Sequence, residues 1–128
     1  MEKSAVFHRP VDNLAYLLDN KTLHIRLKTK ANDLQKVLLI HGDPYIWADG
    51  EWMHDMERMY LAGTDGVHDY WEIKIFSETN RIRYGFKLIS SNEEVIYTEK
   101  GFYSTPPKDS DYYFCFPYLH NTDLFDAP

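Results

Sequence analysis

Carboxylates are the most abundant groups in this chain that could do chemistry, since 20 of its 128 residues are Asp or Glu. Asp55 and Glu57 would share a face if their segment is a strand, and Asp43 and Asp49 bracket an aromatic loop. Hydrolysis by a pair of carboxylates needs the two groups at a set distance across a substrate cleft. Chance pairs are common in so acidic a sequence, and no spacing in it indicates such a cleft. We therefore predict that the chain contains no catalytic residues.

The histidines show no spacing typical of a metal site. They stand at positions 8, 24, 41, 54, 68 and 120, with no His-x-His or His-x-x-x-His pair. We interpret them as surface or hydrogen-bonded structural residues. Oxygen ligands suited to calcium do occur, but turns and caps use the same residue types; these are Asp12, Asn13, Asp19, Asn20 and Asp123. With no phosphate-binding glycine loop either, we predict no metal and no cofactor.

The single cysteine and the charge pattern exclude several further classes of protein. Cys115 cannot form an internal disulfide, and its place between Phe114 and Phe116 favours a buried structural thiol. The net charge is −6, and Lys and Arg alternate with apolar or neutral residues, as on the solvated face of a strand. Nucleic-acid binding needs clustered cations, so we expect no such partner. We also expect no membrane span, no signal peptide and a cytoplasmic location.

The most informative segment runs from His41 to Gly50 and follows an apolar run at residues 37–40. Gly42 and Pro44 mark it as a loop, and an extended backbone would place Tyr45 and Trp47 on the same side. Aromatic rings on a rigid loop suit sugar stacking or an interface anchor. Alternatively, Trp47 folds back and caps the end of the domain. The residues alone leave both interpretations open.

Stretches of alternating apolar and polar residues recur along the chain, as in half-buried strands. The clearest lie at residues 23–28, 70–76 and 82–88, and short apolar runs add strands at 37–40, 95–98 and 101–103. Turn signals such as Asp49-Gly50 separate them, and Ser90-Ser91-Asn92 is typical of a hairpin. This pattern predicts an all-β fold, an immunoglobulin-like antiparallel two-sheet β-sandwich.

The alternation also predicts which side chains point between the two sheets. We expect this core to contain Leu23, Ile25, Leu27, Leu38, Ile40, Trp71, Ile73, Tyr84, Phe86 and Phe114. Residues 52–61 compete as a helix because Met53, Met56 and Met59 are spaced by three. Polar residues interrupt that face and no N-cap precedes it, so we predict strand or irregular structure there. We assign the sandwich domain to residues 1–120 and a polar, turn-rich linker to residues 121–128.

Several stretches resemble the N-terminal domain of the neopullulanase, cyclomaltodextrinase and maltogenic amylase group. The resemblance covers nearly the whole chain and is strongest at residues 112–120, Tyr-Tyr-Phe-Cys-Phe-Pro-Tyr-Leu-His, continuing through 123–128. The other matching stretches are residues 6–10, 22–30, 41–45, 83–86 and 97–103.

In that family the domain is classed as carbohydrate-binding module family 34 and precedes a catalytic (β/α)8 barrel. The resemblance implies that residues 121–128 lead toward such a barrel, which is absent from this chain. It further implies a homodimer of the parent enzyme, in which this domain packs against the catalytic barrel of the second subunit and narrows its cleft. The loop that carries Tyr45 and Trp47 matches the part that reaches the partner's substrate, an α-glucan or cyclodextrin. The family's catalytic residues lie on the barrel, so none can be carried over.

Two functional hypotheses follow from the resemblance. In the first, the domain is a non-catalytic element that mediates dimerisation and shapes the partner's substrate cleft. In the second, it is an autonomous starch- or cyclodextrin-binding module. An autonomous module should bind cyclodextrin by itself, whereas an assembly element should bind only weakly when alone. The linker-like end and the single pair of loop aromatics favour the first hypothesis.

Overall fold

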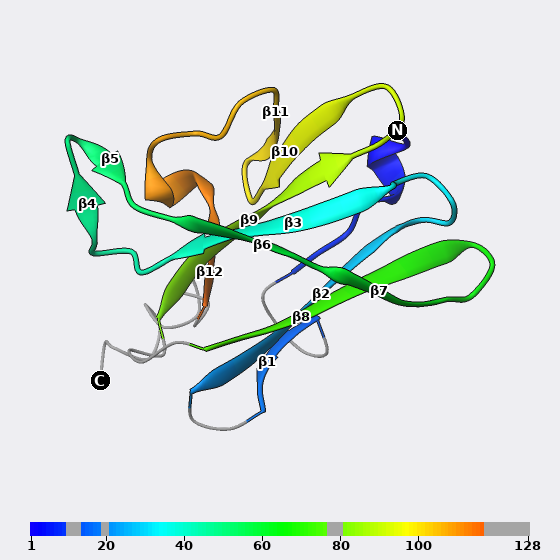
Figure 1. The fold of residues 1–128 in the computed structure, drawn as a ribbon, viewed down its shortest axis with the longest axis horizontal. Helices are drawn as coiled ribbons and strands as arrows, with labels where there is room; N and C mark the ends of the chain where they lie inside the picture. Colours follow the sequence, from blue (N-terminus) through cyan, green and yellow to red (C-terminus); the bar gives the residue numbers. More distant parts are fainter. Residues whose placement is uncertain (10–13, 19–20, 77–80, 117–128) are drawn as a thin grey trace, which may run out of the picture.

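The computed structural model describes residues 1–9, 14–18, 21–76 and 81–116, which form two antiparallel sheets packed face to face (Figure 1). The first sheet has four strands, in the order β1 (Ala15–Leu17), β2 (Thr22–Lys30), β8 (His68–Phe76) and β7 (Tyr60–Thr64). Its centre is the long β2–β8 pair, where Ile25 lies opposite Ile73 and Leu27 opposite Trp71. Both strands point every second side chain to the core, as their alternation predicted.

The second sheet has six strands. Five follow the order β11 (Gly101–Tyr103), β10 (Glu94–Thr98), β9 (Ile82–Ile89), β3 (Lys36–Gly42) and β6 (Asp55–Arg58). The sixth, β12 (Phe114–Phe116), pairs with the first half of β9, while β10 pairs with its second half. The predicted hairpin at residues 90–92 is confirmed as the β9–β10 turn. The sandwich predicted from the sequence is therefore the observed architecture.

Small elements complete the part of the chain that the structure describes. A 3-10 turn, η1 (Lys3–Ala5), precedes the arm that joins β2 through a Phe7–Lys28 bridge. A short hairpin, β4 (Trp47–Ala48) and β5 (Glu51–Trp52), lies at one end of the sandwich. Beside it runs the segment from β11 to β12, which contains the 3-10 turn η3 (Ser110–Tyr112) (Figure 1).

Residues 52–61 are strands rather than a helix, as predicted. They form β5, β6 and β7, and the chain passes from the second sheet to the first between β6 and β7. Met59 lies at this crossing with its side chain buried, and its N–H donates to the Val37 carbonyl at 2.9 Å. The neighbouring side chains of β6 and β7 are exposed. Spacing of the methionines by three therefore reflected one buried residue between two exposed edge strands.

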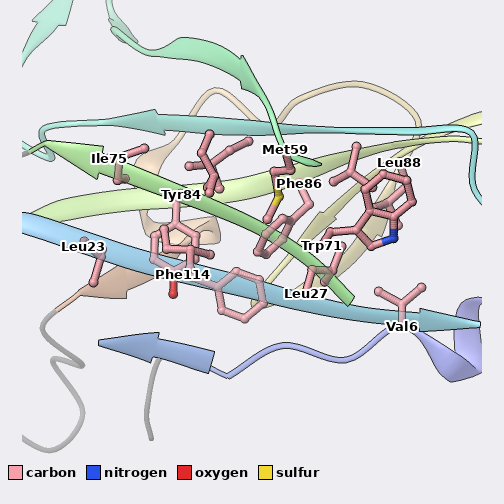
Figure 2. Packing of buried hydrophobic residues seen from close by; sticks show 14 of the residues in the cluster. Val6, Leu23, Leu27, Met59, Trp71, Ile75, Tyr84, Phe86, Leu88 and Phe114 are labelled. Atoms are coloured by element: carbon pink, nitrogen blue, oxygen red, sulfur yellow. The ribbon is translucent and has the colours of Figure 1, made fainter. Parts of the chain in front are cut away.

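The core lies between the sheets (Figure 2). Eight of the ten predicted residues belong to it: Leu23, Ile25, Leu27, Trp71, Ile73, Tyr84, Phe86 and Phe114. Val37, Leu39, Met59 and Leu88 join them, together with Val6 from the N-terminal arm. The prediction was wrong for Leu38 and Ile40. On β3 it is Val37 and Leu39 that point inward, so Leu38 and Ile40 point to the opposite face of the sheet.

Ile40 is nevertheless buried, because a second apolar cluster covers the outer face of the six-stranded sheet. This outer cluster consists of Ile40, Trp52, Ile96 and Tyr113, with Tyr103 and Tyr112 packed against it. The Trp52 and Tyr113 rings lie 4.7 Å apart. Gly85 lies directly beneath Tyr113, since a Cβ at that position would come within 2.9 Å of the tyrosine ring. The sheet is thus apolar on both faces at this end.

His8 ties the N-terminal arm to the core. Its Nδ1 donates to the Arg26 carbonyl at 2.6 Å, and its Nε2 accepts from the Tyr84 hydroxyl at 2.6 Å; the network assigns this tautomer. The Phe86 and Phe114 rings make T-shaped contacts with the imidazole. Burial in these surroundings lowers the pKa of His8 from 6.5 to about 3. The imidazole is neutral in the folded protein, in agreement with a hydrogen-bonded structural histidine.

The structure also bears on the predictions for Cys115, for metal binding, for membrane spans and for the linker. Cys115 is buried, as predicted. Within the four described ranges, no group of three or more His, Cys, Asp or Glu side chains could hold a metal ion, and no helix is long and apolar enough to cross a membrane. The segment assigned as a linker, residues 121–128, lies outside the described residues. So do the oxygen donors considered for calcium: Asp12, Asn13, Asp19, Asn20 and Asp123.

Replacing Trp71 by Ala should lower the free energy of unfolding by about 3–5 kcal/mol. The ring is buried between the sheets, and its Nε1 donates to the Thr29 hydroxyl at 3.0 Å, which would lose this partner. Phe76→Ala on the same strand is the matched control, because Phe76 is 63% exposed. It should shift stability by no more than about 0.5 kcal/mol. Equal urea midpoints for the two variants would show that the Trp71 side chain does not stabilise the core.

His8 should make folding sensitive to acid. The unfolded chain takes up a proton on His8 below pH 6.5, whereas the folded chain does so only near pH 3. The contribution of His8 is therefore complete above pH 6.5 and falls by about 1.4 kcal/mol per pH unit on acidification toward pH 3. Urea unfolding of the wild type and of His8→Gln at several pH values isolates this slope. Parallel pH profiles for the two proteins would contradict it.

Candidate functional site

The loop after β3 starts from a close backbone contact at Gly42. A Cβ on this residue would lie 2.4 Å from the Met53 carbonyl oxygen and 3.0 Å from the Trp52 ring. Only glycine allows the two strands to approach in this way. The contact fixes where the loop leaves the sheet and where the chain returns.

Asp43 then fixes the course of the loop through both its carbonyl and its carboxylate. The carbonyl accepts from the Trp52 indole Nε1 at 2.9 Å, and Oδ1 accepts from the Tyr45 N–H at 2.8 Å. The second contact is an Asx turn, which sets the backbone direction at Tyr45. Because Trp52 belongs to the outer cluster, the loop is anchored to buried structure at its first residue.

The loop continues into a tightly closed hairpin. Asp49 and Gly50 both have positive φ, at 54° and 77°, which is the type I′ turn that suits a two-residue connection. Trp47 is then paired with Trp52 across the hairpin, and the Met53 N–H donates to the Ile46 carbonyl at 3.0 Å. The turn predicted at Asp49-Gly50 is therefore confirmed, and it sets the register in which Trp47 lies opposite Trp52.

Tyr45 and Trp47, the two predicted site residues, are both exposed, at 71% and 45% of their surfaces. The Trp47 indole donates to the Pro44 carbonyl at 3.0 Å, and the Arg81 guanidinium lies 4.9 Å from the centre of the Tyr45 ring. Both side chains are thus oriented by neighbours while remaining accessible. Trp52, at 3% exposure, is the ring that packs on the sheet in this region.

A hollow of about 220 Å³ opens beside Tyr45, between this loop and the segment that contains η3. Two basic side chains, one carboxylate and an aromatic ring line it; the lining residues are Pro44, Tyr45, Arg81, Arg83, Ser110, Asp111 and Cys115. Arg83 Nη1 donates to the Tyr113 carbonyl at 3.2 Å, and its Nη2 lies 3.6 Å from Asp111 Oδ1. We call this hollow the Tyr45 pocket.

Sequence reasoning missed most of the Tyr45 pocket. It interpreted Arg81 and Arg83 as the solvated face of a strand, whereas the Arg83 side chain is only 14% exposed. The alternation was correct, but nothing in it indicated that the outer face of β9 would be covered. Tyr113, which covers it, donates its hydroxyl to the Pro107 carbonyl at 2.6 Å, and burial raises its pKa to about 12.

Two of the carboxylates considered as catalytic pairs, Asp43 and Glu57, have structural partners. Glu57 Oε2 lies 2.7 Å from His41 Nε2, at the exposed edge strand β6. Asp43 closes the turn at Tyr45, and Asp49 occupies the tip of the β4–β5 hairpin.

Comparison with known proteins gives the relationship of this chain. Residues 1–120 match the family model described as "Alpha amylase, N-terminal ig-like domain". The chain belongs to this family. A solved structure of a cyclomaltodextrinase superposes with a TM-score of 0.84 at 34% identity, covering 93% of this chain and 20% of the other.

Relatives of the α-amylase N-terminal domain family are similar along the whole chain. Identity is 50% over 129 residues with a cyclomaltodextrinase of Geobacillus thermopakistaniensis (strain MAS1), and 42% over 129 residues with a maltogenic alpha-amylase of Bacillus acidopullulyticus. It is 33% over 131 residues with an intracellular maltogenic amylase of Bacillus subtilis (strain 168). Each match covers 100% of this chain, and the chain spans 22% of each relative.

Removing either exposed ring should leave the stability of this domain nearly unchanged. We expect Tyr45→Ala and Trp47→Ala to shift the free energy of unfolding by no more than about 0.5–1 kcal/mol, because neither side chain is buried. Trp52→Ala is the comparison within the same hairpin. It removes a buried ring and the hydrogen bond to the Asp43 carbonyl, so it should cost about 3–5 kcal/mol. Thermal unfolding of the three variants checks this order, and a large loss for Trp47→Ala would identify it as a cap.

Proposed function

We propose that this chain is the non-catalytic N-terminal domain of an α-glucan hydrolase of the cyclomaltodextrinase type. In this proposal the domain mediates dimerisation, and its Tyr45–Trp47 loop completes the substrate cleft of the partner subunit's catalytic barrel. One observation carries the proposal: two large aromatic rings are exposed on a loop that buried residues hold in place. The match to a cyclomaltodextrinase along 93% of the chain supports the class of enzyme.

Exposed aromatic rings that do not move on binding suit the recognition of sugars. A tyrosine or tryptophan ring offers an apolar face to the C–H groups of a glucosyl unit and a polar edge to its hydroxyls. A loop already ordered in the free protein loses little conformational entropy when it binds. The type I′ turn and the Asp43–Trp52 hydrogen bond supply that order here.

Dimerisation is supported by apolar surface on the edge strands. Met56 on β6 and Tyr60 and Leu61 on β7 are each about half exposed, although edge strands are usually protected by charge or by cover. Contact with another part of the assembly would bury these side chains. A cytoplasmic location is part of the same proposal, and the name of the Bacillus subtilis relative, an intracellular enzyme, supports it.

The decisive experiment uses the longer enzyme that contains this chain. Tyr45→Ala and Trp47→Ala should change the ratio of kcat/KM for cyclodextrin to kcat/KM for starch, since differential transition-state binding sets preference. A lost stacking contact corresponds to a several-fold change in this ratio. Phe76→Ala, which removes an exposed ring elsewhere, is the control and should leave the ratio unchanged.

Two outcomes would contradict the proposal. If all three variants keep the wild-type ratio, the loop does not contribute to the substrate cleft. If the isolated domain binds cyclodextrin as tightly as the whole enzyme does, it is the autonomous binding module that the sequence left as the alternative.

A further inference from the structure

We propose that the α-amino group of Met1 is a modification-sensitive site of this domain. As an ammonium ion it binds two carboxylates, Asp33 and Glu93, and so holds the N-terminal arm, residues 1–9, against both sheets. An acyl group or a preceding residue attached to this nitrogen removes the charge from that position and loosens the arm. The amine lies at the opposite end of the sandwich from the β4–β5 hairpin, so this role is separate from that of the aromatic loop (Figure 1).

The two carboxylates reach the ammonium group from different turns. The Met1 nitrogen lies 3.4 Å from Glu93 Oε1 and 3.9 Å from Asp33 Oδ1. Asp33 belongs to the connection from β2 to β3, which joins the two sheets, and Glu93 belongs to the β9–β10 hairpin. Figure 1 shows the N-terminus beside that hairpin. Because both carboxylates approach the same atom, they would repel each other if its positive charge were removed.

The residues that follow the amine are fixed by further contacts. The Glu2 N–H donates to Asp33 Oδ2 at 2.7 Å, and the Met1 side chain packs against the core. Phe7 then pairs with Lys28 on β2, and each N–H donates to the other residue's carbonyl, at 2.7 and 3.0 Å. The ammonium group is thus the first of a series of contacts that attach the arm to the sandwich.

Opening of the arm affects the interior because the arm supplies buried residues. Val6 belongs to the core between the sheets, and His8 accepts a hydrogen bond from the buried Tyr84 hydroxyl. When the arm opens, Val6 is exposed and Tyr84 loses its partner. The Asp33 and Glu93 side chains are 16% and 40% exposed, and ion pairs of partly exposed groups contribute modestly. The amine therefore sets how often the arm opens and does not decide whether the domain folds.

Two changes at the Met1 nitrogen remove the ammonium group while leaving every side chain of the arm in place. Acetylation by an acetyl thioester forms an amide bond at this nitrogen. Of the two protons that the ammonium group loses, one leaves on the thiol and one passes to water, so the product is uncharged. A Gly-Ser extension before Met1 also converts the nitrogen to an amide, and it moves the positive charge to the new first residue.

The test is hydrogen exchange, measured by NMR, of the Phe7 and Lys28 amides, whose mutual hydrogen bonds break when the arm leaves β2. Acetylation, the extension and Glu93→Gln should each speed exchange of these two amides about two- to fivefold, as the loss of a partly exposed ion pair does. Glu94→Gln is the matched control, because Glu94 is the neighbouring carboxylate but pairs with Lys87 at 3.2 Å. Its amides should exchange like those of the wild type.

A combined variant separates the ion pair from other effects of the substitution. Glu93→Gln in the acetylated chain should not speed exchange further, because the charge that Glu93 binds is already gone. Three results would overturn the proposal. One is exchange of the acetylated chain at the wild-type rate. Another is equal exchange in Glu93→Gln and Glu94→Gln. The last is an equal acceleration by Glu93→Gln with and without the acetyl group, which would show that Glu93 acts without the amine.

Discussion

The outer face of the six-stranded sheet is apolar where β3 and β10 carry Ile40 and Ile96, and this face must be covered. A sheet in a two-layer sandwich usually exposes one face to water, and polar residues then occupy that face. Here two rings cover it: Trp52, which follows β3 in the sequence, and Tyr113, which precedes β12. The β4–β5 hairpin and the η3 segment lie at this end of the molecule because each brings one of those two rings.

The exposed aromatic loop follows from the same requirement. Trp52 has to reach the sheet, so the chain between Gly42 and Trp52 makes a compact excursion that returns by the type I′ turn. Within that loop the Trp52 indole fixes Asp43 through its carbonyl, and the side chains of Tyr45 and Trp47 that follow point to solvent. The burial of Trp52 thereby sets the direction of Tyr45 and Trp47. Functional side chains on a loop gain precision when a rigid element positions the loop in this way.

Sequence patterns predicted the strands well because period-two alternation is a direct consequence of sheet geometry. They failed within residues 37–40, where four consecutive apolar residues carry no information on which face points inward. Leu38 and Ile40 were assigned to the core, and Val37 and Leu39 occupy it. Alternation also could not predict the Tyr45 pocket. It indicates that Arg83 faces solvent, and it carries no information that Tyr113, thirty residues later, lies over the same strand. The exposure of Tyr45 and Trp47 could be predicted because both belong to one loop that Gly42 and Pro44 mark in the sequence.

The position of Cys115 has a practical meaning. It is the only cysteine of the chain, and it lies buried on β12, a strand of three residues held along one edge to β9. Cys115 lines the Tyr45 pocket but is only 6% exposed, so a thiol reagent reaches it mainly when that pocket opens wider. The rate of alkylation of this native thiol therefore measures opening of the Tyr45 pocket, and no engineered cysteine is needed. The native thiol thus reports how often this end of the sandwich opens locally.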